Sequence, residues 1–125
     1  MAISILGSTG SIGRQTLEVA EHLGLSVAAL TGNRSVQLLE QQARRFRPRL
    51  TAAADEAAAR DLKVRLADTP VRVLSGPEGV AECARCDEAD TVISAVVGTA
   101  ALLPTLAAIH CGKRVGLANK ESLVC

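Results

Sequence analysis

The chain has 125 residues, the size of one domain, and 48% of them are hydrophobic, enough to form a single buried core. Its net charge is +1 and no basic run occurs, so we expect neither nucleic acid nor a membrane surface as partner. The single aromatic residue, Phe46, leaves no stacking platform for bases, and the absence of Tyr argues against short-chain dehydrogenases, which need a catalytic Tyr. We therefore predict one domain over residues 1–125 that binds a small molecule.

The N-terminus and the cysteines point to the cytoplasm. The opening MAISILGS has neither the basic segment nor the long apolar core of a secretory signal. Cys83 and Cys86 form a CxxC pair, whereas Cys111 and Cys125 stand far apart, which is not the spacing of a zinc ribbon. We interpret all four as reduced structural thiols and expect no metal site.

An apolar strand followed by three glycines opens the chain. Residues 3–13, ISILGSTGSIG, carry the spacing GxxGxxG directly after the strand. In a nucleotide-binding unit Gly7 would allow a tight turn and Gly10 would let the backbone approach a pyrophosphate, while Gly13 would let the next helix pack closely. The spacing alone is a weak signal, and the strand before it strengthens the prediction.

The helix after the glycines completes this unit. We predict it over residues 14–23, with Ser11 as its cap and with Leu17, Ala20 and Leu23 along one buried face. Its unpaired N–H groups and its dipole would bind an anion without any cationic side chain in the loop.

The residues after the second strand indicate which nicotinamide cofactor is bound. Residues 25–30, LSVAAL, predict a buried parallel strand. An NAD-binding unit carries an acid near the end of this strand, whereas the segment 31–35, TGNRS, has none and contains Arg34. A guanidinium binds a 2′-phosphate through charge-assisted hydrogen bonds, so NADP is preferred over NAD. The alternative is that Arg34 is a solvated loop residue.

Further strands and helices alternate along the rest of the chain. Ser35 can cap a helix whose apolar stripe contains Val36, Leu39, Ala43 and Phe46. The run 91–109 carries no charge, but Gly98 and Pro104 interrupt it, so it predicts a strand, a turn and a helix rather than a membrane span. We predict helices over 36–46, from 55 to 67, up to about 86 after a break at 76–79, and from about 102 to 110, and strands over 50–54, 71–74, 91–97 and 114–118.

Six strands that alternate with helices predict an α/β fold, a doubly wound parallel sheet of the Rossmann type with helices on both faces. The glycine loop and the segments 32–35, 98–99 and 119–121 all follow strands, so they should meet at the carboxyl edge of the sheet, where such folds bind ligands. His22 and His110 are interpreted as surface residues near helix ends.

Four segments of the chain resemble the N-terminal NADPH-binding domain of the 1-deoxy-D-xylulose 5-phosphate reductoisomerase family. They are LGSTGSIG at 6–13, FRP at 46–48, LLPTLAAI at 102–109 and GLANKESLV at 116–124. The last is the most specific, because Asn-Lys-Glu-Ser after a buried strand is not a generic feature of nucleotide-binding sheets. The resemblance implies an NADPH-dependent enzyme that converts 1-deoxy-D-xylulose 5-phosphate to 2-C-methyl-D-erythritol 4-phosphate in non-mevalonate isoprenoid biosynthesis.

The resemblance also implies roles for individual residues. The phosphates of NADPH would be bound at the glycine loop, the adenosine 2′-phosphate after the second strand, and the nicotinamide half and the sugar-phosphate substrate after the last strand. Because the family commonly has Asn where this chain has Ser35, the alignment of Gly32 and Asn33 stays open by one residue. The residues implied at the glycine loop are Thr9, Gly10, Ser11 and Ile12, and those implied for the 2′-phosphate are Asn33, Arg34 and Ser35. Asn119 and Glu121 are implied for the nicotinamide half, and Lys120 for the substrate.

The family implies a divalent metal, Mg or Mn, held by carboxylates of a downstream catalytic domain, and a homodimer as the full-length enzyme. Since the chain ends at Cys125, we expect it to bind the cofactor without turning over substrate, and we predict no catalytic residue in it. Two alternatives stay open: a non-enzymatic NADP-sensing module, and the cofactor domain of another two-domain NADP enzyme such as a semialdehyde dehydrogenase.

Overall fold

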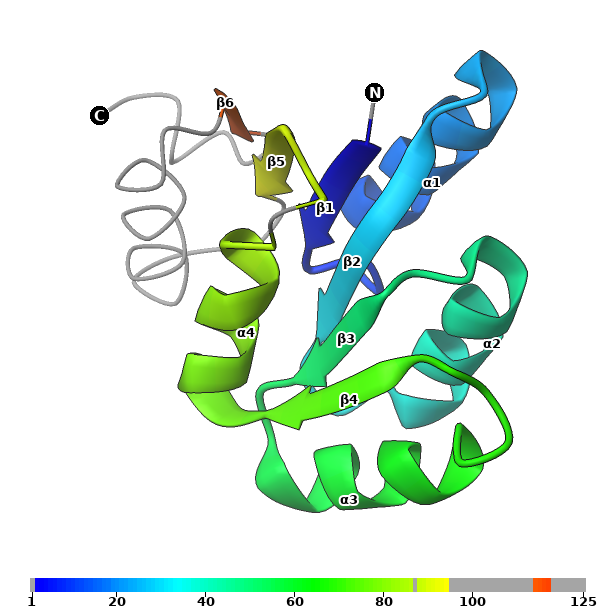
Figure 1. Ribbon diagram of the computed structural model, residues 1–125, viewed down its shortest axis with the longest axis vertical. Coiled ribbons are helices and arrows are strands. Elements are labelled where there is room, and N and C mark those ends of the chain that lie inside the picture. The colour runs from blue at the N-terminus through cyan, green and yellow to red at the C-terminus, as the bar shows by residue number, and fades with distance from the viewer. Residues whose placement is uncertain (1, 87, 95–113, 118–125) are drawn as a thin grey trace.

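Six parallel strands form one sheet in the order β4-β3-β2-β1-β5-β6 (Figure 1). The computed structural model describes residues 2–86, 88–94 and 114–117. The predicted α/β fold, a Rossmann-like doubly wound parallel sheet, is confirmed. Its strands are β1 (Ala2–Leu6), β2 (Ser26–Gly32), β3 (Leu50–Ala53), β4 (Arg72–Ser75), β5 (Thr91–Ser94) and β6 (Arg114–Leu117).

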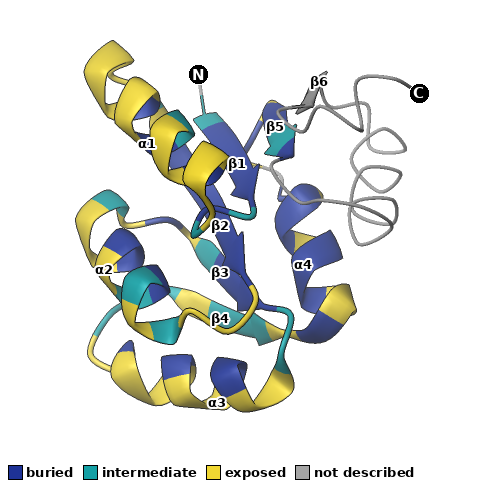
Figure 2. Ribbon diagram, turned by 180° about the vertical axis from the view of Figure 1, so that it is seen from behind, coloured by how far each residue is buried: buried dark blue, intermediate teal, exposed yellow. Residues whose placement is uncertain are grey.

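Helices cover both faces of this sheet, as the alternation of elements predicted. α1 (Ser11–Leu23), α2 (Val36–Phe46) and α3 (Glu56–Arg65) pack on one face, and α4 (Gly76–Ala84) packs on the other (Figure 1). Figure 2 shows that each helix turns its buried side to the strands. Two clusters of buried side chains result; Ile5, Leu17, Leu30, Leu39 and Leu62 belong to the first, and Leu6, Ala28, Val80, Cys83 and Val92 to the second.

The position of β1 locates the site that such a sheet offers. From β1 the chain moves outward through β2, β3 and β4, and then returns to place β5 on the other side of β1. Strand order therefore reverses between β1 and β5, and ligands bind beside this point at the carboxyl ends of the strands. The glycine loop leaves β1 at this end.

The first helix begins earlier than predicted. Gly10 is its N-cap residue, because the Gly10 carbonyl accepts the first helical hydrogen bond, from Arg14 N–H at 2.9 Å. The prediction that Ser11 caps the helix is therefore wrong, since Ser11 lies in its first turn and makes no capping bond. Leu17 and Ala20 are buried as predicted, whereas Leu23, the last residue of the helix, is 64% exposed, so the prediction that Leu23 is buried is wrong.

Other boundaries differ by a few residues. β2 continues through Thr31 and Gly32, because both pair with β3. The predicted break at 76–79 is instead the first turn of α4. Pro77 fits there because N–H groups in the first turn have no partner within the helix, so its missing N–H costs no hydrogen bond. α2 has the predicted bounds, and its stripe is buried at Leu39 and Ala43.

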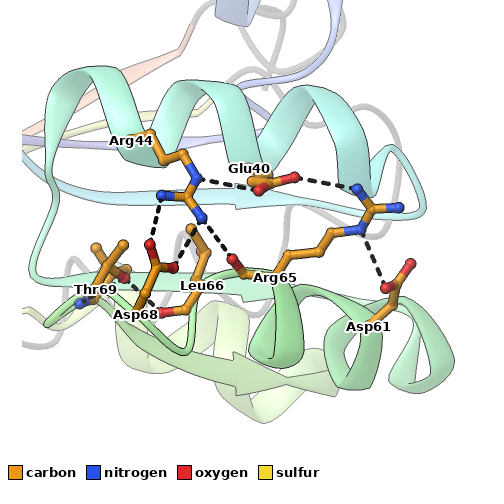
Figure 3. A network of polar contacts seen from close by, with 8 residues as sticks. Glu40, Arg44, Asp61, Arg65, Leu66, Asp68 and Thr69 are labelled. Carbon is orange, nitrogen blue, oxygen red and sulfur yellow. Dashed lines mark hydrogen bonds and ion pairs between the residues drawn. The ribbon is translucent and has the colours of Figure 1, made fainter.

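An ion-pair network joins α2 to α3 (Figure 3). Arg44 of α2 binds Glu40 on its own helix and Asp68 beyond the end of α3, with N–O distances of 3.1 and 2.9 Å. Arg65 of α3 binds Glu40 at 3.2 Å and Asp61 at 3.1 Å. Hydrogen bonds from Arg44 and Arg65 lower the pKa of the Glu40 carboxyl, and the network links α3 to the helix that follows the predicted 2′-phosphate segment.

Both cysteines of the CxxC pair are buried. Cys83 points into the core under α4, and burial raises the pKa of its thiol, which suits a reduced packing residue. His22 is exposed in the last turn of α1, as predicted. Within the described ranges, the structure contains no helix long and apolar enough for a membrane span.

Several predicted features lie outside the described residues. They are the end of the fifth strand at 95–97, the turn at Gly98 and Thr99, the helix with Pro104 and His110, residues 118–122, and Cys111 and Cys125.

Candidate cofactor site

The glycine loop turns sharply at the end of β1 and is held there by β2. Gly7 has φ 82°, a left-handed conformation that glycine adopts without strain, so the predicted tight turn is confirmed. Its N–H lies 3.1 Å from the carbonyl and 3.0 Å from the hydroxyl of Thr31, and Ser8 N–H donates to the same carbonyl at 2.8 Å. The loop is thus fixed to the neighbouring strand before it reaches α1.

Gly13 and Gly10 lack side chains for different reasons. A Cβ on Gly13 would lie 2.1 Å from the carbonyl oxygen of Gly7 and 2.6 Å from Ser8 Cα, so α1 packs directly on the loop backbone. Among the described residues, a Cβ on Gly10 would meet nothing closer than Gly7 O at 3.7 Å, an ordinary contact. In this part of the chain, packing therefore requires glycine at position 13 but not at position 10.

The start of α1 presents N–H groups that α1 itself does not use. The first intrahelical bond belongs to Arg14, so the N–H groups of Ser11, Ile12 and Gly13 precede it. Among the residues that the structure describes, none of these three has a backbone acceptor. Gly10, Ser11 and Ile12 are exposed, so a ligand can reach this positive end of the helix.

The structure brings the glycine loop and the segment after β2 together. A Cβ on Gly32 would lie 3.2 Å from the Thr9 methyl group, so the two loops touch. Backbone bonds from the two residues after β3 secure the second loop, from Ala54 N–H to Gly32 O at 2.9 Å and from Asp55 N–H to Asn33 O at 3.4 Å. The two candidate phosphate sites are therefore neighbours.

The second loop exposes its polar side chains. Asn33, Arg34 and Ser35 are all exposed, and the Arg34 side chain is 82% accessible, with Nε 4.0 Å from the Asp55 carboxylate. Ser35 occupies the N-cap position of α2 as predicted, but its hydroxyl makes no capping bond. A hollow of about 590 Å³ at the first turn of α2 is lined in part by Arg34 and Ser35. Arg34 lines this hollow, and an exposed guanidinium can bind a phosphate.

One buried polar side chain at the site was missed by sequence reasoning. Gln42 of α2 is 7% exposed and makes two hydrogen bonds to Ser8 in the glycine loop. It lies three residues after Leu39, on the stripe that faces the sheet. A polar residue within an apolar stripe was the signal that could have revealed it.

The remaining predicted site residues lie beyond the described part of the chain. Asn119, Lys120 and Glu121 are among them, so the structure does not place them relative to the glycine loop. Among the described residues, no group of three His, Cys, Asp or Glu side chains is placed to hold a metal ion.

Comparison with known proteins gives a consistent assignment. Residues 3–125 match the 1-deoxy-D-xylulose 5-phosphate reductoisomerase family. The chain is 48% identical over 122 residues to the family enzyme of Ruminiclostridium cellulolyticum, covering 98% of this chain and 32% of that protein. It is 52% identical over 122 residues to the enzyme of Halothermothrix orenii, covering 96% and 32%. The chain therefore spans about a third of the length of these relatives.

Solved structures of the same family superpose closely. The Zymomonas mobilis enzyme in complex with NADPH matches with a TM-score of 0.90 and 42% identity, covering 98% of this chain and 33% of that one. A reductoisomerase in complex with NADPH, fosmidomycin and magnesium matches with a TM-score of 0.92 and 40% identity, covering 99% and 31%.

Proposed function

Because the chain belongs to the 1-deoxy-D-xylulose 5-phosphate reductoisomerase family, we propose that it binds NADPH at the carboxyl edge of its sheet. In this proposal residues 1–125 form the cofactor-binding domain of an enzyme that converts 1-deoxy-D-xylulose 5-phosphate to 2-C-methyl-D-erythritol 4-phosphate. The family assignment excludes the alternative that the chain is the cofactor domain of a semialdehyde dehydrogenase. NADPH, when bound, supplies the hydride for reduction, and the residues of this chain bind and orient it.

One observation carries the proposal: N–H groups at the start of α1 lie beside Gly10, where the described residues leave space for a ligand to approach. In our proposal the segment Thr9, Gly10, Ser11 and Ile12 binds the diphosphate. The N–H groups of Ser11 and Ile12 donate to it, whereas Gly10, whose own N–H donates to Gly7 O at 3.3 Å, allows the close approach. Peptide donors suit this task because they are fixed by the loop and oriented with the helix dipole. The missing Cβ of Gly10 then serves the ligand, because no atom of residues 2–86, 88–94 or 114–117 packs into this space.

The 2′-phosphate would be bound by the second loop. We assign it to Arg34, whose exposed guanidinium can form charge-assisted hydrogen bonds, together with the polar side chains of Asn33 and Ser35. Thr9 touches Gly32, so the two loops can hold two phosphate groups of one molecule. NADPH is therefore preferred over NADH.

The rest of the reaction needs residues that the described structure does not include. We assign Asn119 and Glu121 to the nicotinamide half of the cofactor and Lys120 to the sugar-phosphate substrate. A divalent metal, Mg or Mn, would be held by the part of the family's length that this chain does not span. We further propose that the complete enzyme is a cytoplasmic homodimer.

Titration of the purified chain with NADPH, NADH and ATP, followed by calorimetry, tests this proposal. We expect NADPH to bind more tightly than NADH by about tenfold or more, because a charge-assisted hydrogen bond contributes about 1.5 to 3 kcal/mol. ATP has a triphosphate but no 2′-phosphate, so it should bind more weakly than NADPH. Equal affinity for all three ligands, or no binding of NADPH, would contradict the proposal.

A further inference from the structure

The carboxamide of Gln42 forms a closed pair of hydrogen bonds with Ser8. Gln42 Nε2 donates to the Ser8 carbonyl at 2.8 Å, and the Ser8 hydroxyl lies 2.7 Å from Gln42 Oε1. Because a carbonyl only accepts, Nε2 must face it, and Oε1 is left for the hydroxyl. Both residues are buried, so water does not compete for these bonds.

All the polar groups of Ser8 are used inside the protein. Its N–H donates to Thr31 O, its carbonyl accepts from Gln42, and its hydroxyl lies near both Gln42 Oε1 and, at 3.2 Å, Thr31 O. Thr31 O already accepts from the N–H groups of Gly7 and Ser8, so we infer that the Ser8 hydroxyl donates its single hydrogen to Gln42 Oε1. Ser8 is therefore an internal anchor of the loop rather than a ligand contact.

We propose that Gln42 is a positioning residue that holds the glycine loop ready for the cofactor diphosphate, an inference that rests on the proposed function. Ser8 stands between the turn at Gly7 and the segment Thr9 to Ile12, so fixing Ser8 fixes the donors that follow it. A loop that already has its binding conformation loses less freedom on binding, which raises affinity. Gln42 itself is buried on α2 and acts through Ser8.

The same helix links the two phosphate sites. α2 begins directly after Arg34 and Ser35, and Gln42 on this helix is hydrogen-bonded to Ser8 in the glycine loop. The distance between the loops is thus set by one rigid element together with the contact of Thr9 on Gly32. Gln42 therefore helps to keep the two sites at the spacing that one dinucleotide requires.

Gln42→Met tests this role, because methionine keeps the length and apolar volume of glutamine but makes neither hydrogen bond. Lys63→Met is the control for an added methionine, since Lys63 is exposed in the last turn of α3 and does not line the hollow beside Arg34. For each variant, calorimetry gives the affinity for NADPH and nuclear magnetic resonance titration gives that for adenosine 2′-monophosphate. The second ligand has the 2′-phosphate and lacks the diphosphate.

We expect Gln42→Met to weaken NADPH binding about tenfold, since two buried hydrogen bonds to the loop are lost. The affinity for adenosine 2′-monophosphate should change by less than about twofold, because the Arg34 side chain lies beside Asp55 and makes no bond to Ser8 or Gln42 in the described structure. Lys63→Met should leave both affinities unchanged. Equal losses for both ligands in Gln42→Met would show general damage to the fold and overturn the proposal, as would wild-type binding of NADPH.

Two further measurements keep the proposal testable. Ser8→Ala removes the hydroxyl partner, and the double variant should bind NADPH no more weakly than Gln42→Met alone if Gln42 acts through Ser8. Additive losses of affinity in the double variant would refute the proposal that Gln42 acts through Ser8. If Gln42→Met does not fold, Ser8→Ala alone tests the proposal: weaker NADPH binding supports it, and wild-type binding overturns it. Amide exchange of Ser8 without ligand should quicken in Gln42→Met, and this readout is independent of whether the wild type binds NADPH. Failure of the wild type to bind would instead remove the proposed function.

Discussion

Replacing Gly10 by alanine separates what the cofactor needs from what the fold needs. Gly10 has φ −77° and ψ 173°, a conformation that any residue adopts, and an added Cβ would lie 3.7 Å from its nearest neighbour in the described part of the chain. We therefore expect the free energy of unfolding of Gly10→Ala to stay within about 0.5 kcal/mol of wild type. NADPH binding should weaken at least tenfold, about 1.4 kcal/mol, because the methyl group occupies the approach of the diphosphate. Gly10→Val should abolish binding.

Gly13→Ala provides the contrast. Its Cβ would lie 2.1 Å from Gly7 O and 2.6 Å from Ser8 Cα, and both are backbone atoms that cannot rotate away. The loop and α1 would have to separate by about 1 Å or more to restore an ordinary contact. We expect a loss of stability of about 1 to 3 kcal/mol or more, the usual range for overpacking.

Urea unfolding followed by circular dichroism measures the stabilities, and calorimetry with NADPH measures the affinities. The reasoning predicts that Gly10→Ala is stable and binds weakly, whereas Gly13→Ala is already destabilised without ligand. If Gly10→Ala bound NADPH like wild type, the diphosphate would not approach at Gly10. If Gly10→Ala lost as much stability as Gly13→Ala, the conclusion that a Cβ fits beside Gly10 would be wrong.

Three further substitutions test the surroundings of the site. Arg34→Ala should weaken NADPH binding by about 1.5 to 3 kcal/mol and leave NADH binding almost unchanged, and calorimetry showing equal losses would remove Arg34 from the 2′-phosphate. Asp55→Ala should lower the free energy of unfolding by about 1 kcal/mol, because the Asp55 carboxylate caps α3 by accepting from Ala58 N–H at 3.0 Å; Asp55→Asn, which can still accept, should lose less in the same urea experiment. Hydrogen bonds from Arg44 and Arg65 lower the pKa of Glu40 below its ordinary value of 4.5. The ionised Glu40 therefore stabilises the fold above pH 4.5, and this stabilisation is lost as the pH falls through the lowered pKa. Glu40→Gln should therefore show a smaller drop in urea midpoint than wild type between pH 7 and pH 3, and an identical drop would contradict this role.

The order of elements could be predicted because it depends on local pattern. The apolar runs at β1 and β2, the stripe on α2 and the glycines between them each express a short-range rule of strand, helix or turn. Boundaries were less well predicted, because they are set by partners. Thr31 and Gly32 belong to β2 since β3 pairs with them, and Ser11 belongs to α1 since Gly10 accepts the first helical bond.

The sequence by itself determined the parallel sheet, the family and the two loops that we assign to the cofactor. Composition, glycine spacing and the segment around Arg34 are properties of neighbouring residues, and they can be read without coordinates. Only the tertiary structure decided which glycine serves the fold and which is left open to a ligand, and that Gln42 holds Ser8 from another helix. The physical reason is that a clash at Gly13 and a buried amide at Gln42 both depend on contacts between segments that only folding brings together.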